Sequence, residues 1–326
     1  MTSAHQRQNT TRGWIVVSIR WAATIAVLAA LLHFLPFAQL RSALAQVPLT
    51  RFLAILIGYG IAHFIGIVKW RMVVNAAGAE LDLATSAQCY AGGLFGTLFL
   101  PSIVGGDVVR LAVGLRRSPR PAAVFAGNIA DRFLDVCAQG GLVLLGLILL
   151  PGSVPPQLQS AARHALLALA TLAAVLTVLA LVLYKPIFGG RSIRFRRRIA
   201  RLRHALGAVS RRPLVLFFCW LLGTGVQGLL LVLAALLAIS CGLILPLRIW
   251  LFAWPLAKLA AILPLTQGGI GVREAALVAL LAPFGAPGPL VLAAGLAWEG
   301  IIVAGNVAAG GVAFLLRHFE SRKILG

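Results

Sequence analysis

Long apolar runs, separated by short polar stretches, limit what this chain can fold into more than any other feature. They fall at residues 14–35, 52–68, 84–103, 133–150, 164–184, 214–240, 249–265 and 289–316. About 20 apolar residues cross the hydrocarbon core as a helix, which satisfies its own backbone hydrogen bonds there. Only 11% of the residues are charged, against roughly 25% in an average soluble domain. The sequence therefore predicts an all-α integral membrane protein with a single transmembrane domain over residues 1–326.

Two of these runs, 84–103 and 249–265, lead into the same motif. Residues 100–110 read LPSIVGGDVVR and residues 263–273 read LPLTQGGIGVR, so both fit LPxxxGGxxxR at a separation of 163 residues. Proline and a glycine pair break a helix at membrane depth. The same shift also brings most of the other apolar runs into register. We therefore expect two repeats, a first over 14–150 and a second over 164–316.

The basic residues favour one topology for these repeats. The segment 185–213 holds ten Lys and Arg and no acidic residue, which predicts a basic cytoplasmic loop. If the two broken elements are re-entrant, 21 Lys and Arg face the cytoplasm and five face outside; if they cross, the basic loop is placed outside. We expect six full transmembrane helices, two re-entrant elements and inverted-topology repeats, with both termini cytoplasmic. The basic loop should contact anionic lipid headgroups rather than nucleic acid.

Charged residues at the two glycine corners are the first candidates for a functional site. Inverted repeats are typical of transporters whose substrate binds near the bilayer midplane at broken helices. Each corner offers a base, an acid and glycine N–H groups, which could bind a zwitterionic or phosphate headgroup; a purely structural ion pair is the alternative. The corner residues are Gly105, Gly106, Asp107 and Arg110 in the first repeat, and Gly268, Gly269, Arg273 and Glu274 in the second.

A second group of charged residues lies near the start of the fourth run. The spacing of Asn128, Asp131 and Asp135 partly resembles the first aspartate-rich motif of membrane-embedded prenyltransferases, which bind magnesium and diphosphate. No aspartate occurs at 291–298 in the second repeat, and Arg132 between the acids suits charge neutralisation better. A catalytic or a structural role for Asp131 and Asp135 stays open.

Other polar residues lie within single runs. Lys258 and Glu299 could line a substrate site and pair with each other, and a titrating Glu299 could couple transport to an ion gradient. Tryptophans near the ends of the runs predict an interfacial belt: Trp14, Trp21, Trp70, Trp220, Trp250 and Trp254. The histidines and the four cysteines show no zinc-ligand spacing, so we expect no metal site and no cofactor.

Three segments together resemble a known family. GGLFGTLFLPSIVGGDVVR, AGNIADRFLD and LPLTQGGIGVREAALVALLAPFG are similar in order and spacing to the lysylphosphatidylglycerol synthase transmembrane region family. The resemblance implies a phospholipid flippase region and carries its polar corner residues over to Asp107, Arg110, Arg273 and Glu274. Asp131 and Arg132 stand where relatives often have a Glu-Arg pair. Because the chain ends ten residues past the last run, we expect no synthase domain and no lipid aminoacylation.

These observations predict a flippase-like transporter, and not an enzyme, in a bacterial-type inner membrane. Its expected cargo is a phospholipid or an isoprenoid-linked lipid headgroup, and its expected partners are membrane lipids: an anionic or zwitterionic phospholipid, or a polyisoprenyl or hopanoid lipid. A lipid-biosynthesis enzyme is a further expected partner. Three alternatives stay open: a membrane-embedded prenyl or lipid transferase, an accessory subunit of a lipid or envelope pathway, and a transporter of small solutes.

Overall fold

The computed structural model describes most of the predicted transmembrane domain. The structure describes residues 37–100, 103–150, 193–261, 266 and 269–325, and also the isolated positions 29, 160, 163, 167, 170, 171 and 174. The expected runs 14–35 and 164–184 lie almost entirely outside the described residues, as does Gly268. Every regular element among the described residues is a helix, which confirms the all-α prediction.

Four helices are long and apolar enough to cross a membrane, so this is a multi-pass membrane protein. They are α3 (Leu49–Ala76), α6 (Pro121–Leu149), α9 (Pro213–Ser240) and α12 (Gly288–Leu325). Three of them extend well beyond the apolar runs that predicted them: α3 continues past 68, α6 begins before 133, and α12 continues past 316. In α3 and α6 the added turns carry charged side chains that are buried against partners, which an apolarity criterion does not detect.

Shorter helices complete the fold. They are α2 (Phe37–Ala45), α4 (Leu83–Gly96), α5 (Ile103–Arg117), α8 (Ile193–Ser210), α10 (Leu247–Ala260), α11 (Val272–Leu281) and the 3₁₀ turn η2 (Ala282–Phe284). The basic segment 185–213 is therefore largely helical where it is described, and not a plain loop. Leu202, Ala205 and Val209 of α8 are buried in a cluster with residues of α3 and α6, which gives this segment an apolar face of its own.

The glycine pair of the first LPxxxGG motif lies in the first turn of α5, which packs against α4 as an antiparallel pair. A Cβ atom on Gly106 would lie 2.6 Å from the carbonyl oxygen of Gly93, and one on Gly105 would lie 2.5 Å from Cβ of Leu100. The glycine pair therefore permits close helix packing at this corner. At the second corner, between α10 and α11, Gly269 and Gly271 adopt φ values of +81° and +86°, which glycine adopts without strain.

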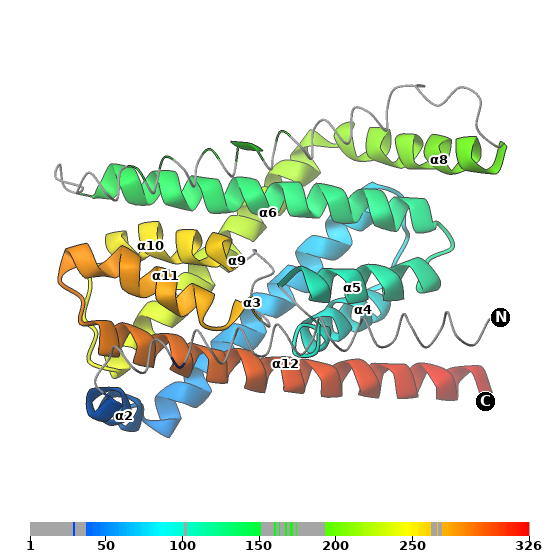
Figure 1. Ribbon diagram of the computed structural model, residues 1–326. Coiled ribbons are helices and arrows are strands. Elements are labelled where there is room, and N and C mark those ends of the chain that lie inside the picture. The colour runs from blue at the N-terminus through cyan, green and yellow to red at the C-terminus, as the bar shows by residue number, and fades with distance from the viewer. Residues whose placement is uncertain are drawn as a thin grey trace, which may run out of the picture.

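Helices related by the 163-residue shift make reciprocal contacts. In Figure 1, α3 and α9 cross the centre of the molecule, and α4 packs on α12 while α10 packs on α6. The two central helices run antiparallel: Arg51 of α3 donates to Ser240 Oγ at 3.1 Å, whereas Lys69, near the other end of α3, lies beside Cys219 of α9. Helix α4 of the first half thus packs on α12, the last long helix of the second half. Helix α10 of the second half packs on α6, the last long helix of the first half.

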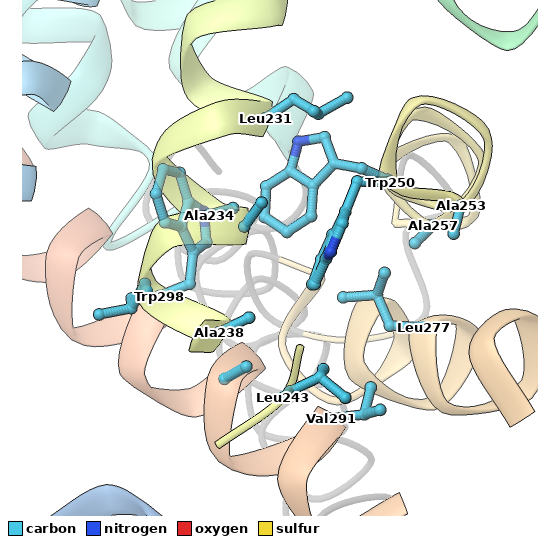
Figure 2. Packing of buried hydrophobic residues seen from close by; sticks show 14 of the residues in the cluster. Leu231, Ala234, Ala238, Leu243, Trp250, Ala253, Ala257, Leu277, Val291 and Trp298 are labelled. Carbon is cyan, nitrogen blue, oxygen red and sulfur yellow. The ribbon is translucent and has the colours of Figure 1, made fainter. Parts of the chain in front are cut away.

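The largest apolar core lies among α9, α10, α11 and α12. Figure 2 shows Trp250 and Trp298 with smaller side chains such as Ala234, Ala238 and Leu277 between these helices. Trp250 is 2% exposed, and Trp70 and Trp254 are also buried. The interfacial belt predicted for these three tryptophans is therefore wrong, because their rings fill the interior instead.

Candidate functional site

Six charged side chains from three helices form a group that we call the first cluster. Its members are Lys69 of α3, Asp107 and Arg110 of α5, and Asp131, Arg132 and Asp135 of α6. Three are basic and three acidic, so their formal charges cancel. Buried charges are tolerated when they are paired in this way.

Asp131 lies at the centre of the first cluster, with a side chain that is 0% exposed. Lys69 Nζ lies 2.8 Å from Asp131 Oδ1 and also pairs with Asp135. Arg132 reaches all three aspartates, at 3.2 Å from Asp107, 3.2 Å from Asp131 and 2.9 Å from Asp135. Arg110 pairs with Asp107, as their spacing predicts, and its Nη2 lies 3.8 Å from Asp131. The structure thus joins the corner residues to the predicted group on α6.

Two aromatic rings also contact the guanidinium of Arg110. Its guanidinium carbon lies 5.6 Å from the ring centre of Trp70 and 4.9 Å from that of Tyr90, within the range of cation–π attraction. Trp70 Nε1 donates to Asn128 Oδ1 at 3.2 Å, which fixes the indole. Sequence reasoning did not select Lys69, Trp70 or Tyr90 for the site. The only signal for Lys69 was a charge at the edge of an apolar run, which also suits a side chain that reaches toward water.

Arg273, Glu274 and Glu299 form the second cluster, at the contact of α11 with α12. Arg273 Nη2 lies 2.7 Å from Glu274 Oε1 and 2.8 Å from Glu299 Oε1. The Gly271 N–H donates to Glu274 Oε2 at 2.7 Å, as in a capping box at the start of α11. The Arg273 guanidinium lies 5.7 Å from the ring of Trp254. Both corner arginines thus pair with a carboxylate near the start of a helix and lie over a buried tryptophan.

Lys258 lies between the two clusters without joining either. Its Nζ donates to Gln227 Oε1 of α9 at 2.7 Å. It lies within electrostatic range of Asp135 and Arg132 in the first cluster and of Arg273 in the second. The predicted Lys258–Glu299 pair is wrong, because Glu299 binds Arg273 while Lys258 points to α9.

A chain of neutral hydrogen bonds joins helices of both repeats near these clusters. The hydroxyl of Tyr59 donates to Asn306 Oδ1 at 2.9 Å, and Asn306 Nδ2 donates to Thr97 Oγ1 at 2.9 Å. Tyr59 packs edge-on against His63 and Trp298, with ring centres 4.3 Å and 6.1 Å apart. This chain ties α3, α12 and α4 together.

Several buried donors in the clusters have no protein partner among the described residues. They are Nε of Arg110, Nε of Arg132, Nε of Arg273 and the indole Nε1 of Trp254. Buried N–H groups are nearly always paired, so donors left over in this way are available to a polar ligand. Guanidinium N–H groups suit the oxygens of a phosphate or a carboxylate. The arrangement can therefore bind an anionic group while its own carboxylates balance the remaining charge.

A comparison with known protein families gives a match over most of the chain. Residues 15–310 match the family described as the lysylphosphatidylglycerol synthase TM region. No curated protein matches the chain in sequence. The matched region contains both corners, α3, α6, α9 and the greater part of α12, and the chain therefore belongs to the lysylphosphatidylglycerol synthase TM region family.

Proposed function

We propose that this protein moves a lipid headgroup across the inner membrane, as a flippase-like transporter of a phospholipid or an isoprenoid-linked lipid. The observation that carries the proposal is the pair of buried clusters, each of which contains an arginine from a glycine corner. Charged groups inside a membrane protein are costly and usually mark a substrate or ion path. Each cluster contains an arginine with an unused N–H group, which suits a lipid whose headgroup carries a phosphate.

The reciprocal packing supports an inverted repeat over 14–150 and 164–316. A half that enters the membrane from the opposite side makes its equivalent helices antiparallel, and α3 and α9 run this way. In this arrangement the α4–α5 and α10–α11 pairs are re-entrant hairpins, both termini are cytoplasmic, and the basic segment 185–213 faces anionic lipids. Rocking of one repeat against the other then opens the site to each leaflet in turn.

In the proposed mechanism, the headgroup enters between the two clusters while the acyl chains stay in the bilayer. Arg110 and Arg273 bind its phosphate with the N–H groups that the protein leaves unused. Asp107 and Glu274 balance the charge of the arginines when the site is empty. Lys258 and the Asp131–Arg132 pair lie close enough to adjust the charge that the headgroup meets. A lipid-biosynthesis enzyme would supply the cargo.

The transferase alternative needs carboxylates that are free to bind magnesium and diphosphate. Asp107, Asp131 and Asp135 each contact Arg132, and the last two also contact Lys69. These contacts favour charge neutralisation and leave the three aspartates poorly placed as metal ligands. The structure therefore offers nothing that favours a second function over lipid transport.

The test uses purified protein in liposomes that contain a small fraction of fluorescent lipid, with anionic, zwitterionic and isoprenoid headgroups in parallel. Dithionite added outside reduces only outer-leaflet fluorophores, so protein-dependent loss beyond one half reports lipid movement. The test variant is Arg110→Ala with Arg273→Ala. The matched control is Arg120→Ala, because Arg120 forms an exposed ion pair with Glu80 away from both clusters.

We expect movement of at least one headgroup class by the wild type and by Arg120→Ala, and its loss in the double variant. Quenching that stops at one half for every lipid in the wild type would contradict the proposal. Equal rates in the double variant and the wild type would show that lipid moves without the two arginines, and would refute the site.

A further inference from the structure

The second cluster holds one more acid than base. Arg273, Glu274 and Glu299 have side chains that are 8%, 0% and 14% exposed, and they contain one cation and two carboxylates. In the first cluster, by contrast, three cations face three carboxylates. An uncompensated buried charge is expensive, and a carboxylate commonly removes that cost by binding a proton.

The two carboxylates also compete for one nitrogen atom. Arg273 Nη2 donates to Glu274 Oε1 at 2.7 Å and to Glu299 Oε1 at 2.8 Å. Two negative groups held this close repel each other, and a proton on either one removes the repulsion. The geometry is that of two acids that share one cation and one proton.

The contacts indicate which acid takes the proton. Glu274 is fixed at both oxygens, by the Gly271 N–H and by Arg273, and it is fully buried against Gly295. Glu299 has Arg273 as its single hydrogen-bond partner among the described residues, and it is the more exposed of the two. A proton can therefore reach Glu299 and bind its free oxygen without breaking the capping box of α11.

In the part of the chain that the structure describes, no second cation contacts Glu299. On α3, Tyr59 lies within electrostatic range of it, and on α10 Lys258 donates to Gln227 instead. Helix α9 carries no charged residue. The remaining titratable groups on elements packed against α12 are Arg41 on α2, which is exposed; Asp82, Cys89 and Tyr90 on α4; Cys219 on α9; and Arg51, His63, Lys69 and Arg71 on α3. Arg51 donates to Ser240, and Lys69 pairs with Asp131 and Asp135.

We propose that Glu299 binds and releases a proton during transport, an inference that rests on the proposed function. A proton from water forms an O–H bond with the Glu299 carboxylate, which leaves that side chain neutral. Arg273 then no longer has to neutralise two acids, and its N–H groups can bind a lipid phosphate. Loss of the proton to water on the other side restores the Arg273–Glu299 ion pair and displaces the phosphate. Proton and headgroup thus bind together, and the α11–α12 contact changes with each cycle.

A direct test measures the proton without measuring transport. Wild-type protein in liposomes is titrated while infrared absorption of protonated carboxyl groups is recorded, beside Glu299→Gln and the control Glu80→Gln. We expect a titrating carboxyl component that is lost in Glu299→Gln and kept in Glu80→Gln. Circular dichroism and monodisperse elution confirm that each variant is folded. A wild-type component that persists unchanged in Glu299→Gln would overturn the proton site.

Transport in the same liposomes separates this inference from the proposed function. A pH gradient across the membrane should change the rate of lipid movement in the wild type and in Glu80→Gln, but not in Glu299→Gln. If Glu299→Gln moves lipid and its rate responds to the pH gradient as that of the wild type does, the proton inference is overturned and the transport function is kept. If the carboxyl component is lost in Glu299→Gln but neither the wild type nor any variant moves lipid, the result supports the proton site and overturns transport.

Discussion

Lys69 of α3 and Asp131 of α6 form a buried ion pair, with Nζ 2.8 Å from Oδ1 and side chains that are 5% and 0% exposed. The pair joins two membrane-spanning helices of the first repeat, and Asp131 is in turn contacted by Arg132 of its own helix. Lys69 thus connects α3 to the cluster that the glycine corner completes. Its removal should affect stability, because Asp131 cannot reach water without movement of these helices.

Replacement of Lys69 by methionine should destabilise the protein strongly. Removal of one partner from a buried ion pair leaves an uncompensated charge and typically costs about 3–5 kcal/mol. Because Asp131 keeps Arg132 as a partner, we expect a loss toward the lower end of that range. Reversible unfolding in mixed detergent micelles, monitored by circular dichroism, measures it.

Two further variants help to explain the loss of stability expected for Lys69→Met. Arg120→Ala breaks an exposed ion pair with Glu80 and should cost less than about 1 kcal/mol. Lys69→Met with Asp131→Leu removes both buried charges and should recover part of the stability lost in Lys69→Met alone. If Lys69→Met unfolded at the same denaturant fraction as the wild type, the pair would have no structural role.

The sequence alone predicts much of the corner geometry but not the clusters. The LPxxxGG repeat predicts Asp107 beside Arg110, because side chains three residues apart share a face of a helix. The contact of Arg273 with Glu274 joins sequence neighbours and does not follow from that spacing. Contacts between helices depend on packing angles that no local pattern encodes. Lys69 and the Arg273–Glu299 contact across α11 and α12 were missed for that reason.

The same limit explains the tryptophans and the helix ends. Trp70 and Trp254 looked like interfacial residues because they lie near the ends of apolar runs, but each packs beside a buried arginine. Helix α6 begins at Pro121 because proline suits the first helical turn, and its charged first half is buried against α5 and α3. Runs of apolar residues detect the lipid-facing part of a span and not its polar, protein-facing part.

Helix contact in the first repeat requires glycine at position 127. A Cβ atom there would lie 2.5 Å from Cα of Val74, so Gly127→Ala should separate α6 from α3 and lower stability. Gly60→Ala is the matched control, since nothing lies within 4 Å of its added methyl group. Alanine is favoured over glycine in a helix by about 0.5–1 kcal/mol, so the control should be neutral or stabilising.

Detergent unfolding compares the two alanine variants directly. The expected order of midpoints is Gly60→Ala at or above the wild type and Gly127→Ala clearly below it. Equal midpoints for Gly127→Ala and the wild type would mean that α3 and α6 are not in close contact at Val74.

Asp82 should make stability depend on pH at the start of α4. The Thr85 N–H donates to Asp82 Oδ1 at 3.1 Å. Hydrogen bonding from the Thr85 side chain, and secondarily from this N–H, lowers the pKa of the Asp82 carboxyl below its ordinary value. A lowered folded pKa means that the stabilisation is present above the unfolded pKa of about 3.9 and is lost as pH falls through the folded pKa. Removal of the cap in Asp82→Ala should cost about 1 kcal/mol at neutral pH.

An asparagine at position 82 distinguishes the effect of the charge on this helix cap from the effect of its hydrogen bond. Asp82→Asn keeps an oxygen acceptor but does not titrate, so the stability difference between wild type and Asp82→Asn should shrink as pH falls below about 4. Thermal unfolding at a series of pH values measures that difference. A difference that stays constant over the range would show that Asp82 does not act as a charged cap.

The proposed inverted repeat makes a prediction about sidedness at two equivalent helix ends. Leu49 begins α3 and is 71% exposed, and the 163-residue shift carries it to Arg212, beside the exposed Arg211 that precedes α9. In parallel repeats these ends lie on the same side of the membrane; in inverted repeats they lie on opposite sides.

The four native cysteines are first replaced by alanine or serine, and Leu49→Cys or Arg211→Cys is then added singly. A membrane-impermeant maleimide should label Leu49→Cys from outside intact cells, and Arg211→Cys only after the membrane is opened. Labelling of both from one side would refute the inverted repeat, because two helices that each cross once from the same side cannot be related by an axis in the membrane plane.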